Sequence, residues 1–355
     1  MHAPGLTPST TPTQLLMNTQ NRLAKIAAFC ALPILVALIA SPAFSQPPPP
    51  PVSPIAPPAT AQPPAVVPTP TRNGKPASPP RPGEKREMTM EPLELVTRDG
   101  VKLRAFYFPS DKGKEAVPVI ICHEWQGQAS PYQKLVKQLW DAGCAVIVPE
   151  FRGHGGSREF EVNGKKVAFD LARMSKLDVG KIITGDMEAV KKFLRKENND
   201  GRLNLNSLAL VGIREGAIIA AHWAVADWNF PSVGAMKQGQ DVKAIVLVSP
   251  EKILKGVSLD ETLQDRFLWQ LPFYVVVGRG SEQFGDADRF FKRLETMRKR
   301  AGRGATDGLW LEPVQTSLSG PALINEVPGV AEKITLFIKK ELVDQAKSFP
   351  YVERD

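Results

Sequence analysis

The 355-residue sequence contains few histidines and cysteines, and this scarcity restricts the chemistry available to it. There are four histidines, and none follows His222. Of the three cysteines, Cys30 lies in an apolar segment near the start, which leaves Cys122 and Cys144 in the remainder. Two cysteines in apolar, strand-like segments predict reduced core residues rather than a disulfide framework.

Motifs for cofactors and metals are also missing. No His, Cys or carboxylate cluster has metal-ligand spacing, so we predict no metal site. There is no Walker motif, no G-x-G-x-x-G after a strand, and no internal repeat. We therefore predict no cofactor.

The positive charge lies mostly outside the expected folded domain. The chain has a formal charge of +8, of which two charges fall in residues 1–45 and a net four in residues 46–86. Only +2 then remains on the rest of the chain. Charge therefore gives no support for nucleic-acid binding.

The first 86 residues read as a targeting segment and a spacer. Residues 1–45 contain Arg22 and Lys25, an apolar run, and small residues at 43–45, which is typical of a secretory signal. Residues 46–86 are rich in proline and predict a disordered, extended linker. We expect export to the periplasm, the cell envelope or the exterior. Contact with a membrane is expected only if the signal stays uncleaved.

Residues 87–345 alternate strand and helix patterns, and residues 346–355 are predicted to be a C-terminal tail. A hairpin is expected at 93–107, with its turn at Asp99-Gly100. Apolar runs predict buried strands at 117–122, 144–148, 208–211, 244–248, 273–277 and 309–311. Amphipathic patterns predict helices at 130–142, 187–194, 286–300 and 328–342. This order predicts an α/β fold with a mostly parallel, doubly wound sheet, an antiparallel N-terminal hairpin and helices on both faces.

Three motifs on this framework resemble those of the α/β-hydrolase superfamily, and of its dienelactone-hydrolase-like and prolyl-peptidase-like single domains. After the strand at 117–122, His123-Glu124-Trp125-Gln126-Gly127 resembles the H-E-x-x-G loop that contributes to the oxyanion site. The segment 149–157, Pro-Glu-Phe-Arg-Gly-His-Gly-Gly-Ser, resembles the P-D-x-R-G-x-G-x-S loop with Glu150 in place of Asp. Gly212-Ile-Arg-Glu-Gly216 occupies the position of the nucleophile elbow.

The resemblance implies a nucleophile, an acid and a histidine in that chain order, and this sequence departs from it. The elbow carries Arg214, whose guanidinium stays protonated and cannot attack a carbonyl. Glu282 or Asp286 could occupy the acid position. The loop that should bear the histidine reads Thr-Ser-Leu-Ser-Gly at 316–320. Ordinary triad hydrolysis is therefore not expected.

The remaining polar residues have both structural and binding interpretations. Glu124 and Arg214 follow neighbouring strands and are expected to lie close enough to pair. Alternatively, Arg214 binds a small anionic ligand at the helix N-terminus beside Glu215, with Glu124 and His123, or it points to solvent. We expect His123, His154 and His222 to be structural.

Three function hypotheses remain open at this point. The first is a non-catalytic binding protein, a pseudo-hydrolase with a ligand at Arg214 or a protein partner in the envelope. The second is an esterase or dienelactone-hydrolase-like enzyme that uses a non-standard set of residues drawn from His123, Glu124, Ser249 and Ser317. The third is a structural envelope protein. A serine or cysteine within hydrogen-bond distance of a histidine would favour the enzyme.

Overall fold

The computed structural model describes residues 87–231, 237–302, 304 and 307–354. The predicted signal segment and proline-rich linker lie outside these ranges. Within them, no helix is both long and apolar enough to cross a membrane.

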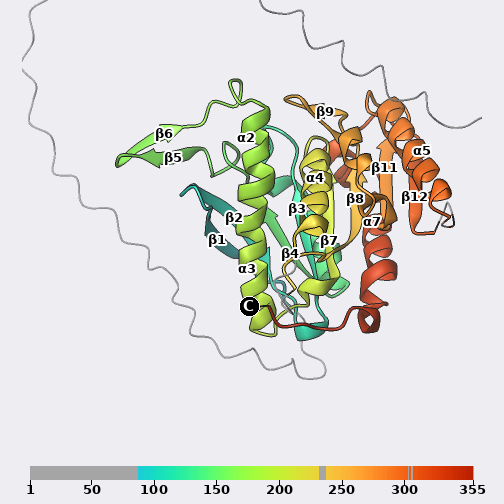
Figure 1. Cartoon of the computed structure of the whole chain (residues 1–355), viewed down its shortest axis with the longest axis horizontal. Coiled ribbons are helices and arrows are strands. Elements are labelled where there is room, and N and C mark those ends of the chain that lie inside the picture. The colour runs from blue at the N-terminus through green and yellow to red at the C-terminus, as the bar shows by residue number, and fades with distance from the viewer. Residues whose placement is uncertain (1–86, 232–236, 303, 305–306, 355) are drawn as a thin grey trace, which may run out of the picture. The chain divides into compact units, whose positions relative to one another are not determined.

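A central sheet of eight strands, in the order β1-β2-β4-β3-β7-β8-β11-β12, organises the described chain (Figure 1). β2 pairs antiparallel with both β1 and β4, and all other neighbours are parallel. The sheet predicted from the sequence is therefore confirmed. The strands are β1 (Glu91–Val96), β2 (Lys102–Phe108), β3 (Val117–Cys122), β4 (Cys144–Pro149), β7 (Leu208–Ile213), β8 (Val242–Val248), β11 (Phe273–Gly278) and β12 (Leu309–Val314).

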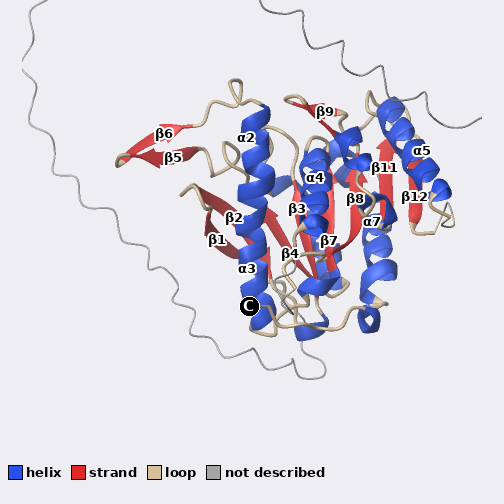
Figure 2. Cartoon of the chain, in the orientation of Figure 1, coloured by secondary structure: helices blue, strands red, loops and turns tan. Residues whose placement is uncertain are grey.

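Helices cover both faces of this sheet because side chains alternate along the apolar strands. In β3, Ile120 and Cys122 pack into one core, whereas Val119 and Ile121 pack into the other. In Figure 2, α3 and α4 lie in front of the strands. The helices are α1 (Gln133–Asp141), α2 (Lys176–Lys181), α3 (Met187–Asn199), α4 (Gly216–Asn229), α5 (Phe284–Arg300), α6 (Gly320–Glu326) and α7 (Val330–Ile338).

The N-terminal hairpin forms as its turn residues predict. β1 and β2 pair from Glu91 opposite Tyr107 to Val96 opposite Lys102. Gly100 takes the left-handed conformation with φ of +80°, which glycine adopts without a steric penalty. The Asp-Gly signal therefore placed the turn correctly.

Several elements differ from the sequence expectation. The helix expected from Ser130 starts as a 3-10 turn, and Ser130 accepts from the Gln128 side chain rather than capping α1. The final helix expected at 328–342 corresponds to α7 and the π-helical turn Lys339–Val343 that follows it, whereas α6 was not predicted. The sequence reading missed α2, the hairpin of β5 (Glu159–Val162) and β6 (Lys165–Ala168), and the short β9 (Ile253–Leu254) and β10 (Val257–Ser258).

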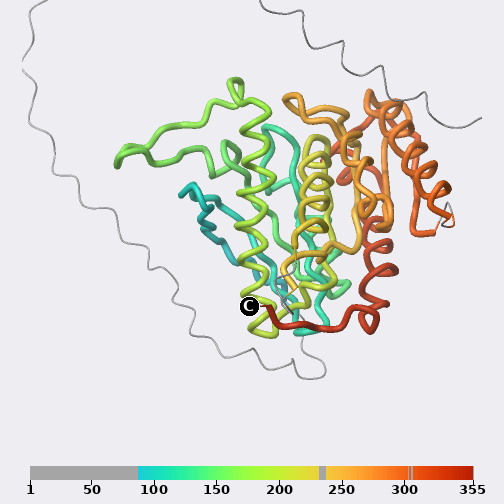
Figure 3. Tube along the Cα trace, viewed as in Figure 1, coloured from blue at the N-terminus to red at the C-terminus, as the bar shows by residue number. Residues whose placement is uncertain are grey.

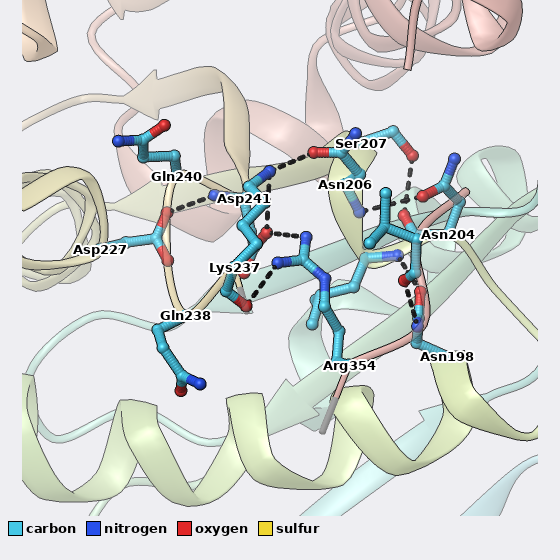
Figure 4. A network of polar contacts seen from close by, with 12 residues as sticks. Asn198, Asn204, Asn206, Ser207, Asp227, Lys237, Gln238, Gln240, Asp241 and Arg354 are labelled. Carbon is cyan, nitrogen blue, oxygen red and sulfur yellow. Dashed lines mark hydrogen bonds and ion pairs between the residues drawn. The ribbon is translucent and has the colours of Figure 1, made fainter. Parts of the chain in front are cut away.

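The predicted C-terminal tail packs onto the domain as far as Arg354. Figure 3 shows the end of the chain beside the lower end of α3, and Figure 4 shows the polar network there. Asparagine side chains bind its backbone at Phe349 (Asn204, 2.6 Å), Pro350 (Asn206, 3.0 Å), Val352 (Asn198, 3.0 Å) and Arg354 (Asn199, 2.8 Å). The packed part of the chain therefore extends through Arg354, beyond the boundary drawn at residue 345.

The Arg354 side chain lies in a group of buried charged residues at the amino ends of β7 and β8. Its guanidinium is ion-paired to Asp241, and Lys191 is ion-paired to Asp241 (3.3 Å) and Asp227 (2.6 Å). Asp227 also accepts the backbone N–H groups of Asp241 and Val242 at 2.6 and 3.1 Å. Each of these charged side chains is at most 8% exposed, so the ion pairs are largely shielded from solvent.

Cys122 and Cys144 lie on the adjacent strands β3 and β4, and both are free and buried. Burial raises the pKa of both thiols, that of Cys144 to about 12. Both therefore stay protonated near neutral pH, as expected of core cysteines.

Candidate functional site

The G-x-x-x-G segment forms the sharp strand-to-helix turn that the sequence predicts. β7 ends at Ile213, Arg214 takes the left-handed conformation with φ of +50°, and α4 starts at Gly216. A Cβ on Gly216 would overlap the carbonyl oxygens of Cys122 and His123, so this position requires glycine. The left-handed φ of Arg214 costs a non-glycine residue about 1 kcal/mol. The elbow geometry is thus present, with an arginine at its tip.

Side chains from other loops hold the Arg214 guanidinium. Its Nη2 pairs with Glu251 Oε1 at 2.8 Å, its Nη1 lies 3.4 Å from Ser319 Oγ, and its Nε lies 3.8 Å from Glu215 Oε2. The expected pairing with Glu124 is wrong. Glu251, from the loop after β8, is held near the guanidinium because its backbone N–H donates to the Arg214 carbonyl at 3.2 Å.

Glu124 has a different partner. The Tyr132 hydroxyl donates to Glu124 Oε2, and the backbone N–H of Gly127 donates to the Glu124 carbonyl at 3.0 Å. Burial, followed by the nearby charge of Glu215, raises the pKa of Glu124, and Arg214 opposes this shift. A Cβ on Gly127 would lie 2.8 Å from the Glu124 carbonyl oxygen, so this loop also needs its glycine.

His123 is held as a neutral residue. Its Nδ1–H donates to the Glu124 carbonyl at 2.7 Å, and its Nε2 accepts the backbone N–H of Phe151 at 3.2 Å. Burial, and then repulsion from His154, lower the pKa of His123 to about 4. Because both ring nitrogens are occupied, His123 is poorly placed to accept a proton from a substrate or a nucleophile.

Neither candidate acid, Glu282 or Asp286, contacts Arg214 at the elbow. Glu282 is exposed, and Asp286 is ion-paired to Arg289. Their neighbour Gln283 is 6% exposed, and its Nε2 donates to Glu251 Oε1 at 2.9 Å. The loop after β11 therefore reaches the elbow through an amide rather than a carboxylate.

The loop after β12 contributes a hydroxyl where the superfamily resemblance implies a histidine. Ser319 Oγ is the atom that approaches Arg214. The next residue, Gly320, has φ of +57°, and a Cβ there would lie 2.9 Å from Arg214 Cδ. Gly320 N–H donates to the buried Ser249 Oγ at 3.1 Å, which fixes this loop against the end of β8.

The candidate nucleophiles Ser249 and Ser317 have no histidine partner. His154 Nδ1–H donates to the Arg152 carbonyl, and His222 Nε2–H donates to the Ser258 carbonyl, each at 2.9 Å. Within the part of the chain that the structure describes, no serine or cysteine side chain is hydrogen-bonded to a histidine. The arrangement that would favour the enzyme hypothesis is not found there.

Carboxylates outnumber cations around the elbow. Arg214 is surrounded by Glu251, Glu215 and, at greater distance, Glu124. Glu251 also lines a neighbouring pocket of about 150 Å³ whose other charged residues are Lys252, Asp260, Asp286, Arg289 and Arg293. The pocket thus has three acids and three bases.

Comparisons with known proteins identify the fold. No protein-family model matches the chain. Over 63 residues it is 32% identical to two uncharacterized proteins of Mycobacterium tuberculosis, from strains CDC 1551 and H37Rv, covering 18% of this chain and 22% of each of theirs. The chain thus matches about a fifth of the length of these curated relatives.

Solved structures share the architecture at low sequence identity. An esterase of Pyrococcus furiosus aligns with a TM-score of 0.52 and 17% identity, over 76% of this chain and 99% of its own. Carboxyl esterase 2 of Tuber melanosporum aligns at 0.50 and 13%, over 73% and 89%. A Klebsiella pneumoniae protein described as a dienelactone hydrolase aligns at 0.50 and 12%, over 73% and 100%. The chain therefore has the α/β-hydrolase fold that its motifs suggested.

The sequence reading missed Glu251, Gln283, Ser319 and Tyr132. Glu251 follows Ser249-Pro250 directly after a buried strand, so its place at the carboxyl end of the sheet was an available signal. Gln283 adjoins the acid candidate Glu282. Nothing in the local pattern indicates that Glu251 and Ser319 contact Arg214, or that Gln283 contacts Glu251.

Proposed function

We propose that this chain is an exported α/β-hydrolase-fold protein that binds a ligand or partner without hydrolysing it. The fold places the elbow and its loops at the carboxyl end of the sheet, where α/β proteins bind ligands. Function must still be argued from the site rather than from the fold.

One observation carries the proposal: an ion-paired arginine occupies the nucleophile position. Arg214 cannot act as a nucleophile, and Glu251 and Ser319 engage its guanidinium. His123 lies near the elbow, but both of its ring nitrogens are already hydrogen-bonded. These contacts favour a binding site over an acyl-transfer site, which needs a nucleophile and a base in contact.

The charges also bear on the ligand. A small anion at Arg214, the ligand that the sequence suggested, would have to displace Glu251 and approach Glu215. The excess of carboxylates favours a ligand that offers a positive or hydrogen-bond-donating group to Glu251. The pocket of about 150 Å³ beside Glu251 gives such a group a place to bind.

Export is the second part of the proposal, and the apolar run with Arg22 and Lys25 supports it. The test is to express the full chain with a C-terminal tag, separate the cell compartments and sequence the N-terminus of the tagged product. A product that begins near residue 46 outside the cytoplasm is expected. A full-length cytoplasmic product would contradict export without affecting the binding hypothesis.

The catalytic question is tested with the purified chain and a panel of p-nitrophenyl esters and thioesters. We expect rates at the buffer background for the wild type, Arg214→Ala and His123→Gln alike. A fluorophosphonate probe followed by mass spectrometry should label no serine. A commercial esterase in the same assay serves as the positive control.

A hydrolysis rate above background that falls at least tenfold in either variant would contradict the proposal. Fluorophosphonate labelling of Ser249 or Ser317 would also contradict the proposal, because these are the candidate nucleophiles of the enzyme hypothesis. An unchanged background rate in all three proteins, with no labelled serine, supports a non-hydrolytic role.

A further inference from the structure

A groove lies at the β12 edge of the sheet, away from the elbow residues. Trp310 and Glu312 are two residues apart on β12 and line the same face. Lys333, Phe337 and Lys340 recur at helical spacing along α7 and the turn that follows it, and they form the opposite wall. The space between these walls is about 270 Å³.

The floor and walls of this groove are largely aromatic. Phe337 stacks on Tyr274, with ring centroids 5.6 Å apart, and meets the edge of Trp310 at 5.4 Å. Leu336 is 63% exposed at the rim. Aromatic walls with an exposed aliphatic rim suit an apolar body of limited size. At about 30 Å³ per water, the volume equals that of roughly nine waters, so we expect a ligand of about ten non-hydrogen atoms.

A buried hydroxyl beside this groove has no partner. Tyr274 is 5% exposed and lines the space, and no described group lies within hydrogen-bond distance of its hydroxyl. Burial raises the pKa of Tyr274, so the hydroxyl stays protonated. This hydroxyl is closed off from solvent, so Tyr274 contributes its ring rather than its hydroxyl to the groove.

The rim carries a net positive charge. Lys333 Nζ is paired with Glu312 Oε1 at 2.6 Å. Lys340 Nζ lies 4.6 Å from the centroid of the Trp310 ring, and among the described residues no carboxylate lies within ion-pair distance of it. The groove is therefore lined by two lysines and one glutamate, and Lys340 is not ion-paired there, so the charge of the groove is complementary to a monoanion.

We propose that this groove binds a small amphipathic carboxylate, with an aromatic or medium-chain apolar body. The apolar body packs between Trp310 and Phe337 and beneath Leu336. Lys340 attracts the carboxylate, and the Tyr274 ring adds apolar contact with the body of the ligand. The proposal is independent of the elbow, because none of these residues contacts Arg214.

The test uses the full chain and calorimetric titration with octanoate, with 1-octanol as the neutral analogue of the same chain length. Octanoate should bind saturably and more tightly than 1-octanol. Leu336→Glu, at an exposed position, should weaken octanoate binding by about tenfold or more, because it removes an apolar contact and adds a repelling charge at the rim.

Two further variants separate the polar contributions. Lys340→Gln should weaken octanoate binding by about two- to fivefold, the range for a solvent-exposed charge pair. Tyr274→Phe keeps the ring that lines the groove and should change the affinity by about twofold or less. Lys339→Gln is the matched control, because Lys339 pairs with Asp344 at 2.5 Å and does not line the groove. It should leave affinity unchanged.

Three outcomes would overturn the proposal. The first is the absence of saturable octanoate binding to the wild type. The second is binding that Leu336→Glu leaves intact, which would place the ligand elsewhere. The third is a wild-type dimer in sedimentation velocity that Leu336→Glu dissociates, which would make the groove an interface between two copies.

Discussion

The two ends of β7 and β8 both carry charged residues, but they differ in burial. At the carboxyl ends, the side chains of Arg214 and Glu251 are 34% and 24% exposed. At the amino ends, Asp227 and Asp241 lie in the buried network of Figure 4 and are at most 1% exposed. Half-exposed ion pairs contribute about 0–1 kcal/mol, whereas removing one partner of a buried pair costs about 3–5 kcal/mol.

This difference separates a site that can exchange partners from one that cannot. Glu251 can leave Arg214 for a ligand at little cost, because water solvates both groups. The buried charges at the amino ends cannot exchange their partners for water, so they hold the end of the chain against the domain. Under the proposed function, ligand binding belongs to the carboxyl ends of these strands, whereas the amino ends stabilise the fold.

The largest expected effect is a loss of stability at the buried amino ends of β7 and β8. Asp227→Ala removes the acceptor of Lys191 and of two backbone N–H groups, and it should lower the free energy of unfolding by about 3–5 kcal/mol. Glu251→Ala is the matched control and should lower it by about 1 kcal/mol or less. Urea unfolding of both variants measures the difference. Equal losses would remove the contrast between the two ends.

The second prediction concerns pH and the loop beside the elbow. His123 has a folded-state pKa of about 4, below its unfolded value of 6.5. The unfolded state thus binds the proton first, and the stabilisation, present above pH 6.5, is lost as pH falls to about 4. The loss should be about 3 kcal/mol.

Urea unfolding at several pH values checks this dependence. His123→Gln should reduce the slope between pH 6.5 and 4, because the amide can replace both hydrogen bonds and does not titrate there. His222→Gln should leave most of the slope of the unfolding free energy against pH unchanged. An unchanged slope in His123→Gln would mean that other groups dominate acid unfolding.

The smallest expected effect tests backbone strain at the elbow. Arg214→Gly and Arg214→Ala both lose the half-exposed ion pair, but only glycine adopts a φ of +50° without penalty. The glycine variant should therefore be more stable than the alanine variant by about 1 kcal/mol. Thermal unfolding of the pair gives the ordering. A more stable alanine variant would show that the turn relaxes once the arginine is gone.

Much of the fold was predictable because its signals are local. The apolar runs at 117–122 and 273–277 could only be buried, and Asp99-Gly100 specified its turn. The final helix was expected to start at Pro328, and α7 begins two residues later at Val330, because a Pro-Gly pair is a local boundary signal. The four asparagines that bind the end of the chain had none, because their partners are more than 140 residues away.

The sequence by itself determined that Arg214 stands at the elbow and that no histidine follows His222. It also determined the order of strands and helices, because side-chain periodicity depends on near neighbours. Only the tertiary structure decided that Glu251, rather than Glu124, pairs with Arg214, and that Arg354 ends among buried carboxylates. Those choices depend on how loops distant in sequence converge at the ends of the sheet, and no local pattern encodes that convergence.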